Sequence, residues 1–302
     1  MLVGDIMNEI DEYAMPYTIK SEREDILFLI DLFDKIKRNN CKFVLLNFKN
    51  TRFFASELYS IYHYYINELA KQGIEIHATY VAEEVDYVNH LTDKYQEDVF
   101  PNHSTVIMPH DFTEELLDKN YDSFDEYVKK EFLPKVKNDH NISNIVIPYL
   151  SELFVNSRTH GNTNNVICAG QIYSTANKIR FVIADFGVSI PYNIENYKIY
   201  GKQNYYHDND AEAIKWSTQA GTSTKTTLGG GLGLNSIKEF IDNTSGRLLI
   251  ISRSGSYERK DASDKITNSN IKFNGTIVVV ELDIMEIEKI KKPVVKKDVF
   301  SI

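Results

Sequence analysis

Three polar residues recur at every fourth position of the stretch ELFVNSRTH, and their side-chain types could support metal-assisted chemistry. They are Glu152, Asn156 and His160. Four residues make about one turn of an α-helix, so the three side chains would form a polar stripe. A carboxylate beside a metal-bound phosphate can orient and deprotonate water, and an amide oxygen is a hard ligand that suits magnesium. The plainer interpretation, a solvated helix face, stays open.

A second motif follows an apolar run that predicts a buried strand. In FVIADFGVSIP, Asp185 closes the run and Gly187 comes two residues later. An Asp at a strand end before Gly often makes only a turn. The same pair could instead place a carboxylate at the edge of a pocket, where it accepts a hydrogen bond from an amino group such as that of adenine. Glycine, which has no side chain, would let the base approach the backbone.

A glycine-rich stretch, GTSTKTTLGGGLGL at residues 221–234, precedes an amphipathic helical pattern. Helix N-termini and consecutive glycine amides attract phosphate, and Lys225 could neutralise a terminal phosphate. The stretch matches neither the GxxxxGK[ST] phosphate-binding loop nor the GxGxxG dinucleotide fingerprint. A flexible loop is the plainer alternative. The order of the three motifs along the chain is more specific than any one of them.

That ordered set resembles the motifs of the GHKL ATPase superfamily, which includes gyrase-like topoisomerases, heat-shock chaperones, histidine kinases and anti-sigma-factor kinases. ELFVNSRTHG is similar to the family's N box, DFGVSIP to its first glycine box and GTSTKTTLGGGLGL to its second. The resemblance spans residues 105–290. It departs from the family at Ser189, where a second glycine is usual, and we expect an altered hinge of the lid there.

The resemblance implies roles for the matching residues. Glu152 would be the catalytic base, Asn156 would hold Mg²⁺, and Asp185 would read the amino group of adenine. Lys225 would contact the γ-phosphate, and the segment 189–227 would close over it as a lid. The implied nucleotide-binding residues are Asn156, His160, Asp185, Gly187, Thr222, Lys225, Gly229, Gly230, Gly231, Leu232 and Gly233. The implied cofactors are ATP and Mg²⁺. For His160, a role in capping the helix C-terminus is an equal alternative.

The elements that must position these motifs alternate along the chain. A helical pattern covers residues 141–161, within which Pro148 either starts or kinks the helix. Strand patterns cover residues 165–174, 178–187, 246–255 and 275–284. The expected fold is α/β. The resemblance to the GHKL superfamily implies a C-terminal Bergerat-type α/β sandwich in which helices lie over one face of a mixed sheet.

The first hundred residues predict a second, smaller α/β unit. A helical pattern, REDILFLIDLFDKIKRN, precedes the strand–helix–strand series KFVLLNFKNTRFFASELYSIYHYYINELAKQGIEIHATYV. This series is similar to a STAS-type domain, in which a serine at the helix start can be phosphorylated. Ser56 holds that place, where it could equally cap the helix. We expect a STAS-like domain at 1–100, an ATP-binding domain at 101–290 and a basic tail at 291–302.

Composition narrows the classes of function. A net charge of −9 argues against a dedicated nucleic-acid binder, and no apolar run is long enough to cross a membrane. The N-terminus lacks the features of a secretory signal. Cys41 and Cys168 have no metal-ligand neighbours, so we expect buried, reduced thiols in a cytoplasmic protein.

Three functions fit these observations. The first is magnesium-dependent ATP hydrolysis that regulates a partner protein or the N-terminal domain. The second is an anti-sigma-type serine/threonine protein kinase, and the third is a non-catalytic switch in which ATP sets the partner. No helix pair with a phosphoacceptor histidine precedes the motifs, which argues against a standard histidine kinase. The expected partners are ATP or ADP and a regulatory protein, with a homodimer left open.

Overall fold

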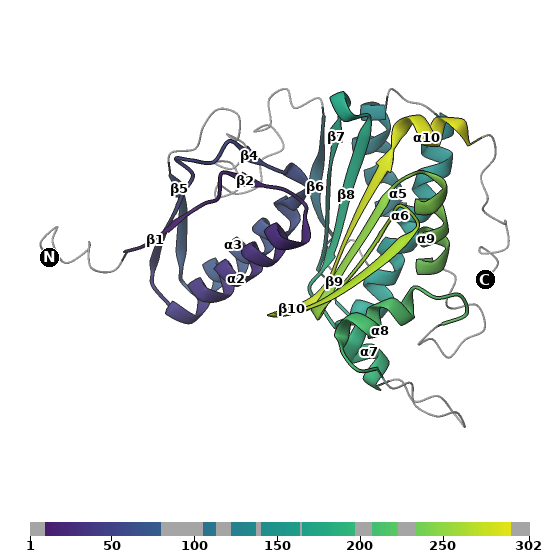
Figure 1. Ribbon diagram of the computed structural model, residues 1–302. Helices are drawn as coiled ribbons and strands as arrows, with labels where there is room; N and C mark the ends of the chain where they lie inside the picture. The colour runs from purple at the N-terminus through teal and green to yellow at the C-terminus, as the bar shows by residue number, and fades with distance from the viewer. Residues whose placement is uncertain are drawn as a thin grey trace, which may run out of the picture.

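The computed structural model describes residues 10–79, 105–112, 122–136, 140–163, 165–196, 207–222 and 233–290. These residues form two α/β units that lie side by side (Figure 1). We call them the N-terminal unit, residues 10–79, and the C-terminal unit, the described residues from 105 to 290. The expected domain boundary near residue 100 and the tail at 291–302 lie outside the described residues.

The N-terminal unit is built on a parallel sheet with the strand order β1-β3-β5 and a short second pair, β2-β4. Its elements are β1 (Ile10–Ala14), β2 (Thr18–Ile19), α2 (Arg23–Asn39), β3 (Phe43–Asn47), β4 (Phe53–Phe54), the 3₁₀ turn η2 (Ser56–Leu58), α3 (Tyr59–Lys71) and β5 (Glu75–Thr79). Helix α2 buries Ile26, Ile30 and Phe33 at helical spacing, and Asn40 ends it in the left-handed conformation. The predicted strand–helix–strand series is therefore present.

The C-terminal unit contains a five-stranded sheet with the order β6-β7-β8-β10-β9. Its strands are β6 (Val106–Phe112), β7 (Val166–Tyr173), β8 (Lys178–Asp185), β9 (Arg247–Lys260) and β10 (Ser263–Asp283). Every neighbouring pair in this sheet is antiparallel, so the expectation of a mixed sheet is wrong in this detail. Sequence patterning also misses β6, because Pro109 interrupts it. Proline is tolerated there because β6 is the first strand in the order, at the edge of the sheet, and its register shifts between Ile107 and His110.

Helices cover one face of this sheet, and the predicted α/β class is confirmed (Figure 1). They are α5 (Asp122–Tyr127), which continues through the π-helical turn η5 (Val128–Phe132) and the 3₁₀ turn η6 (Leu133–Val136), α6 (His140–Gly161), α9 (Gly233–Asn243) and α10 (Ile284–Lys289). A 3₁₀ turn, η7 (Ser174–Ala176), links β7 to β8, and α7 (Ile190–Asn196) and α8 (Asp210–Ser217) lie near one end of the sheet. Helix α6 begins eight residues before Pro148 and ends at Gly161, so the alternative that it starts at Pro148 is wrong.

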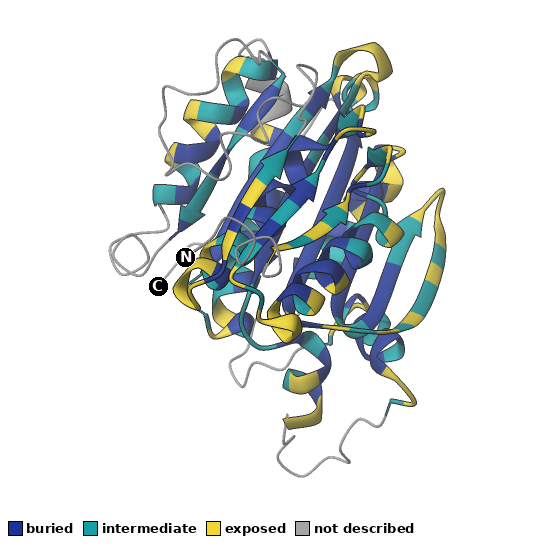
Figure 2. Cartoon of the chain, turned by 90° about the vertical axis from the view of Figure 1, so that its left-hand side faces the viewer, coloured by how far each residue is buried: buried dark blue, intermediate teal, exposed yellow. Residues whose placement is uncertain are grey.

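The sheet of the C-terminal unit is buried on both faces except at the turn end of β9 and β10, where exposed and partly buried residues alternate (Figure 2). Successive side chains of a strand point to opposite faces. In β8, Phe181 and Ile183 pack into the core beneath the helices of the C-terminal unit, whereas Val182 and Ala184 pack into the core of the N-terminal unit. Helices α2 and α3 therefore form a layer between the two sheets (Figure 1).

Buried hydrogen bonds tie the two units together. Glu57, fully buried in η2, accepts hydrogen bonds from Ser21 Oγ at 2.7 Å and from Tyr173 OH on β7 at 2.9 Å. Burial raises the pKa of Glu57, although these hydrogen bonds act against it. Its neighbour Ser56 is also buried and donates from Oγ to Gln171 Oε1 at 2.9 Å. The expectation that Ser56 caps α3 is wrong, because α3 begins only at Tyr59.

Strands β9 and β10 form a long hairpin that doubles back on itself. Asp261 and Ala262 between them both have a positive φ, which is typical of a tight hairpin turn. Farther down β9, Arg253 also has a positive φ, and the register shifts on β10 opposite it. The fold-back brings Glu258 into an ion pair with Arg247, at the other end of the same strand. Sequence patterning predicts only the far ends of this hairpin.

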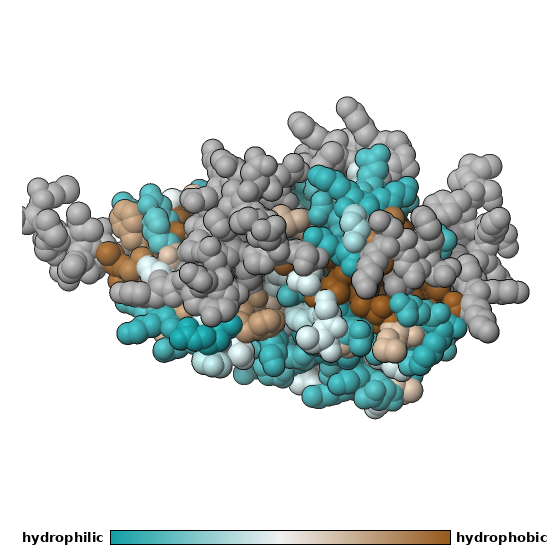
Figure 3. All heavy atoms as spheres, turned by 90° about the horizontal axis from the view of Figure 1, so that it is seen from above, coloured by the Kyte–Doolittle hydropathy of each residue, from teal (hydrophilic) through white to brown (hydrophobic). Residues whose placement is uncertain are grey.

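Two expectations from composition can be compared with the structure. Cys168 is buried, and its burial raises the pKa of the thiol, but Cys41 is only partly buried. None of the helices in the described ranges has the length and apolarity that a membrane crossing requires. Seen from above, the surface of the described residues is largely hydrophilic with smaller hydrophobic areas (Figure 3).

Candidate functional site

Glu152 and Asn156 lie one turn apart on α6 and meet the N-terminus of α9. Asn156 Nδ2 donates a hydrogen bond to Glu152 Oε1 at 3.2 Å. Helix α9 begins at Gly233, where an added β-carbon would lie 2.5 Å from Asn156 Nδ2 and even closer to Glu152 Oε1. A side chain at this position would push the ends of Glu152 and Asn156 aside, so the glycine permits this close approach. The end of the glycine-rich stretch and the polar stripe therefore share one location.

At this meeting point the N-terminus of α9 favours anions, whereas Glu152 adds a carboxylate. The first N–H groups of a helix have no partner within the helix, and they give its N-terminus a partial positive charge. The N-terminus of α9 is therefore a place where phosphate oxygens can bind backbone amides. Glu152 and Asn156 are both half-buried, so their polar atoms are not sealed inside the core.

Asp185 ends β8 as a buried carboxyl group with an exposed fraction of 2%. Gly187 N donates to its Oδ1 at 3.3 Å, and Thr276 on the neighbouring strand also donates to it. Burial raises the pKa of Asp185 to about 8, and these hydrogen bonds only partly offset that effect. Burial in the folded protein therefore favours the protonated form of this carboxyl group.

The chain packs backbone to backbone around Asp185. A β-carbon on Gly161 would lie 2.9 Å from Asp185 Oδ1, and one on Gly187 would overlap the carbonyl oxygen of Gly161. Val188 N donates to that same oxygen at 2.6 Å. A β-carbon on Gly275, which has a φ of 114°, would likewise overlap the carbonyl oxygen of Asp185. Sequence analysis selects Gly187 but misses Gly161 and Gly275, which serve the same packing.

Two other predicted residues have contacts away from this meeting point. The carbonyl oxygen of His160 accepts from Asn193 Nδ2 at 2.6 Å, which ties the end of α6 to α7. Thr222 Oγ1 donates to the carbonyl oxygen of Gln219 at 2.8 Å, just after α8. Among the described residues, Thr222 makes no hydrogen bond to Glu152, Asn156 or Asp185.

Ser189 fits its place without strain. It is not among the described residues with a positive φ, and its Oγ accepts from Tyr192 N, so it caps α7. The remaining predicted site residues lie outside the described residues, as do residues 197–206 and 223–227 of the predicted lid. They are Lys225, Gly229, Gly230, Gly231 and Leu232.

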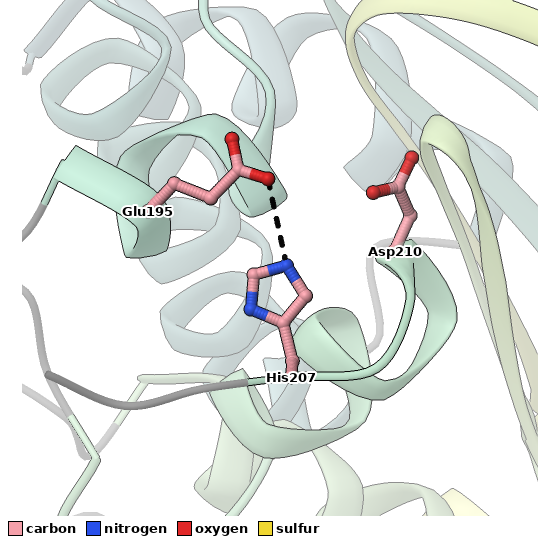
Figure 4. A group of neighbouring side chains, drawn as sticks. All are labelled: Glu195, His207 and Asp210. Atoms are coloured by element: carbon pink, nitrogen blue, oxygen red, sulfur yellow. Dashed lines mark ion pairs between the residues drawn. The ribbon is translucent and has the colours of Figure 1, made fainter.

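A separate cluster of ionisable groups joins Glu195, His207 and Asp210, which lie within the segment 189–227 predicted as the lid (Figure 4). His207 Nε2 lies 3.7 Å from Glu195 Oε1. Arg253 donates to both oxygens of Asp210 at 2.8 Å and to Glu195 Oε2 at 2.8 Å. Burial pushes the pKa of Asp210 upward, but hydrogen bonds from Arg253 and Ser254 outweigh it and hold the pKa at about 2. The guanidinium therefore binds the oxygens that a metal ion would need, and the cluster is an ion-pair network.

Sequence analysis also misses an aromatic contact directly behind the Asp–Gly motif. Phe186, the residue between Asp185 and Gly187, stacks on Tyr64 of α3 with ring centroids 3.5 Å apart. The sequence feature that could have indicated this contact is the position of Phe186 itself, a large apolar residue between Asp185 and Gly187, which both have a predicted function.

Comparison with known proteins finds one weak structural similarity and no similar sequence. The chain matches no protein-family model, and it matches no curated protein. Among solved structures, it is similar to the ATPase region of Saccharomyces cerevisiae topoisomerase II, with 16% sequence identity and a TM-score of 0.29. The match covers 46% of this chain and 38% of that chain, well under two thirds of its length.

Proposed function

We propose that the C-terminal unit binds ATP together with Mg²⁺ and hydrolyses it slowly. The observation that carries the proposal is the approach of Gly233 to Glu152 and Asn156, which joins a helix N-terminus to a carboxylate and an amide. A helix N-terminus binds phosphate, and the two side chains are the types that bind a divalent ion and activate water. The location thus combines three requirements of phosphoryl chemistry.

In this proposal the two ends of the site hold different parts of the nucleotide. The buried Asp185 carboxyl would hydrogen-bond to adenine, and the absence of a side chain at Gly187 would admit the base. The N-terminus of α9 would bind the phosphates. Glu152 would orient a water molecule and take its proton. Exclusion of bulk water by a closing segment would strengthen each of these interactions.

The residues that would hold Mg²⁺ fit that role chemically. Asn156 presents its amide nitrogen to Glu152, so its carbonyl oxygen Oδ1 is the atom available for a hard cation. The ion would neutralise charge on the phosphates, and few protein ligands are needed because Mg²⁺ usually keeps several waters. Glu152 and Asn156 would orient the water and the phosphates around that position.

The position of Ser56 favours hydrolysis over transfer of phosphate to the N-terminal unit. Its hydroxyl is buried between the two units and donates to Gln171, so a kinase acting on Ser56 would first have to separate them. Incubation with γ-labelled ATP distinguishes the two reactions. Free labelled phosphate is expected from hydrolysis, whereas label on the protein that disappears in Ser56→Ala would favour the kinase.

The test of the site compares Glu152→Ala with Glu239→Ala, an exposed carboxylate on α9. We expect calorimetry with Mg²⁺ and ADP to show binding in the wild type and in both variants. Phosphate release from ATP should fall to background only in Glu152→Ala. Unchanged release in Glu152→Ala would reject the residue as the base. A wild-type protein that binds neither ADP nor ATP at millimolar concentration would overturn the proposal as a whole.

A further inference from the structure

The Asp185 motif has a second face that contacts the N-terminal unit. Strand alternation points Asp185 toward the helices of the C-terminal unit and Phe186 toward α3. The rings of Phe186 and Tyr64 are stacked, with centroids 3.5 Å apart and planes 10° apart. Phe273 of β10 meets Phe186 edge-on at 5.6 Å. Aromatic rings from two other elements therefore hold Phe186 in place.

The stacked pair continues into the core of the N-terminal unit. Tyr64 meets Tyr65 edge-on at 5.5 Å, and Tyr65 stacks on Phe33 of α2 with centroids 4.9 Å apart. Phe33 is fully buried. The Tyr64–Phe186 pair is a close face-to-face stack, and the edge-on contact of Tyr64 with Tyr65 is a favourable aromatic geometry. A continuous row of rings thus runs from α2 through α3 to the residue beside Asp185.

Phe186 cannot move far without moving the residues bonded to it on either side. Asp185 and Gly187 are bonded to it directly, and Gly187 lies against the carbonyl oxygen of Gly161 with no space for an added atom. A shift of Phe186 toward a vacated position of Tyr64 would therefore displace the Asp185 carboxyl and the opening beside Gly187. The N–H of Phe186 also donates to Asn165 O at 3.3 Å, slightly longer than the usual range for such hydrogen bonds.

We propose that Tyr64 is a positioning residue for the adenine end of the nucleotide site, an assignment that rests on the proposed function. Tyr64 does not touch the nucleotide and acts through Phe186. The N-terminal unit is thereby a structural part of base recognition, while the phosphate end at Gly233 is independent of it. Loss of the ring at position 64 should weaken binding of adenine nucleotides and leave binding of the phosphate chain unchanged.

The experiment measures two ligands by calorimetry in the full chain, ADP and inorganic tripolyphosphate, each with Mg²⁺. In Tyr64→Ala we expect affinity for ADP about tenfold weaker, equivalent to roughly one strong aromatic pair, with unchanged affinity for tripolyphosphate. Tyr64→Phe keeps the ring and should restore ADP binding to the wild-type value. Tyr17→Ala, which removes an exposed ring of the same unit, is the matched control and should bind both ligands normally.

The outcomes separate this inference from the proposed function. If the wild type binds no ADP, the proposed function fails. If the wild type binds ADP and Tyr64→Ala binds it equally well, only the positioning role fails. Equal weakening of ADP and tripolyphosphate would also overturn it, because that result indicates general destabilisation. If Tyr64→Ala does not fold, Tyr64→Leu replaces it, because leucine keeps an apolar side chain without a ring. The affinities of that variant for ADP and tripolyphosphate are then compared with those of the wild type.

Discussion

Gly187 lies directly against the carbonyl oxygen of Gly161, so the chain just after β8 and the end of α6 touch through their backbones. The adjacent hydrogen bond from Val188 N to the same oxygen, at 2.6 Å, fixes the contact. Two motifs that are separate in the sequence are thereby joined without any side chain between them. The position of Asp185 relative to α6 depends on this contact.

We expect Gly187→Ala to destabilise the protein by about 3 kcal/mol, the upper end of the usual cost of forcing extra volume into a packed region. The added carbon would overlap backbone, which cannot rotate away. Gly73→Ala is the control, because Gly73 has a φ of 76° and no atom within 4 Å of its added carbon. That variant should cost only the strain of a left-handed backbone, about 1 kcal/mol. Urea unfolding measures both, and equal costs would contradict the overlap.

Gly233→Ala should behave differently, since its added carbon meets the ends of two side chains. Glu152 and Asn156 can rotate away, so we expect little loss of stability. Binding of Mg²⁺–tripolyphosphate should weaken by about tenfold or more, because rotation removes both groups from the helix N-terminus. Calorimetry measures the tripolyphosphate affinity of Gly233→Ala, and Glu239→Ala is the control that should bind as the wild type does. Unaltered tripolyphosphate affinity in Gly233→Ala would show that this location does not bind phosphate.

Stability should fall with rising pH because of Asp185. Its pKa is about 8 in the folded protein against 3.8 for an ordinary Asp, so the folded state binds the proton more tightly. The contribution is fully present below about pH 4 and is lost as pH rises through about 8, with a slope of at most about 1.4 kcal/mol per pH unit. Asp185→Asn removes the titration and should flatten this dependence. Urea unfolding between pH 5 and 8 tests it, with the exposed Asp31→Asn as control.

Tyr62 and Tyr257 provide a matched pair of buried phenols. Tyr62 OH is fully buried in the N-terminal unit and has no hydrogen-bond partner among the described residues, whereas Tyr257 OH donates to Asp264 Oδ1 at 2.7 Å. Tyr62→Phe should therefore stabilise the protein by about 1 kcal/mol, and Tyr257→Phe should destabilise it by about the same amount. Thermal unfolding distinguishes the signs. A destabilised Tyr62→Phe would indicate a partner for that hydroxyl.

The local pattern of apolar and polar residues predicts the motifs and most of the helices and strands. The spacing of Glu152 and Asn156 depends only on the helical period, and Asp185 is marked by the apolar strand before it. Strand β6 escapes prediction because Pro109 interrupts its pattern, and the middle of the β9–β10 hairpin escapes because its residues are polar. Contacts across the chain, such as Arg253 with Asp210 and Tyr64 with Phe186, follow from tertiary packing and leave no local signal.

The tight turn at Asp261 and Ala262 has a consequence for the kinetics of folding. Strands β9 and β10 are adjacent in the chain and can zip from this turn, whereas β6 and β7 must close a longer loop around α6 before they pair. We expect the hairpin to be largely formed in the transition state for folding. Ile251→Val, opposite Ile277 in the hairpin, should then slow folding, while Ile107→Val on β6 should mainly accelerate unfolding. Stopped-flow measurements that show the reverse assignment would place the nucleus elsewhere in the sheet.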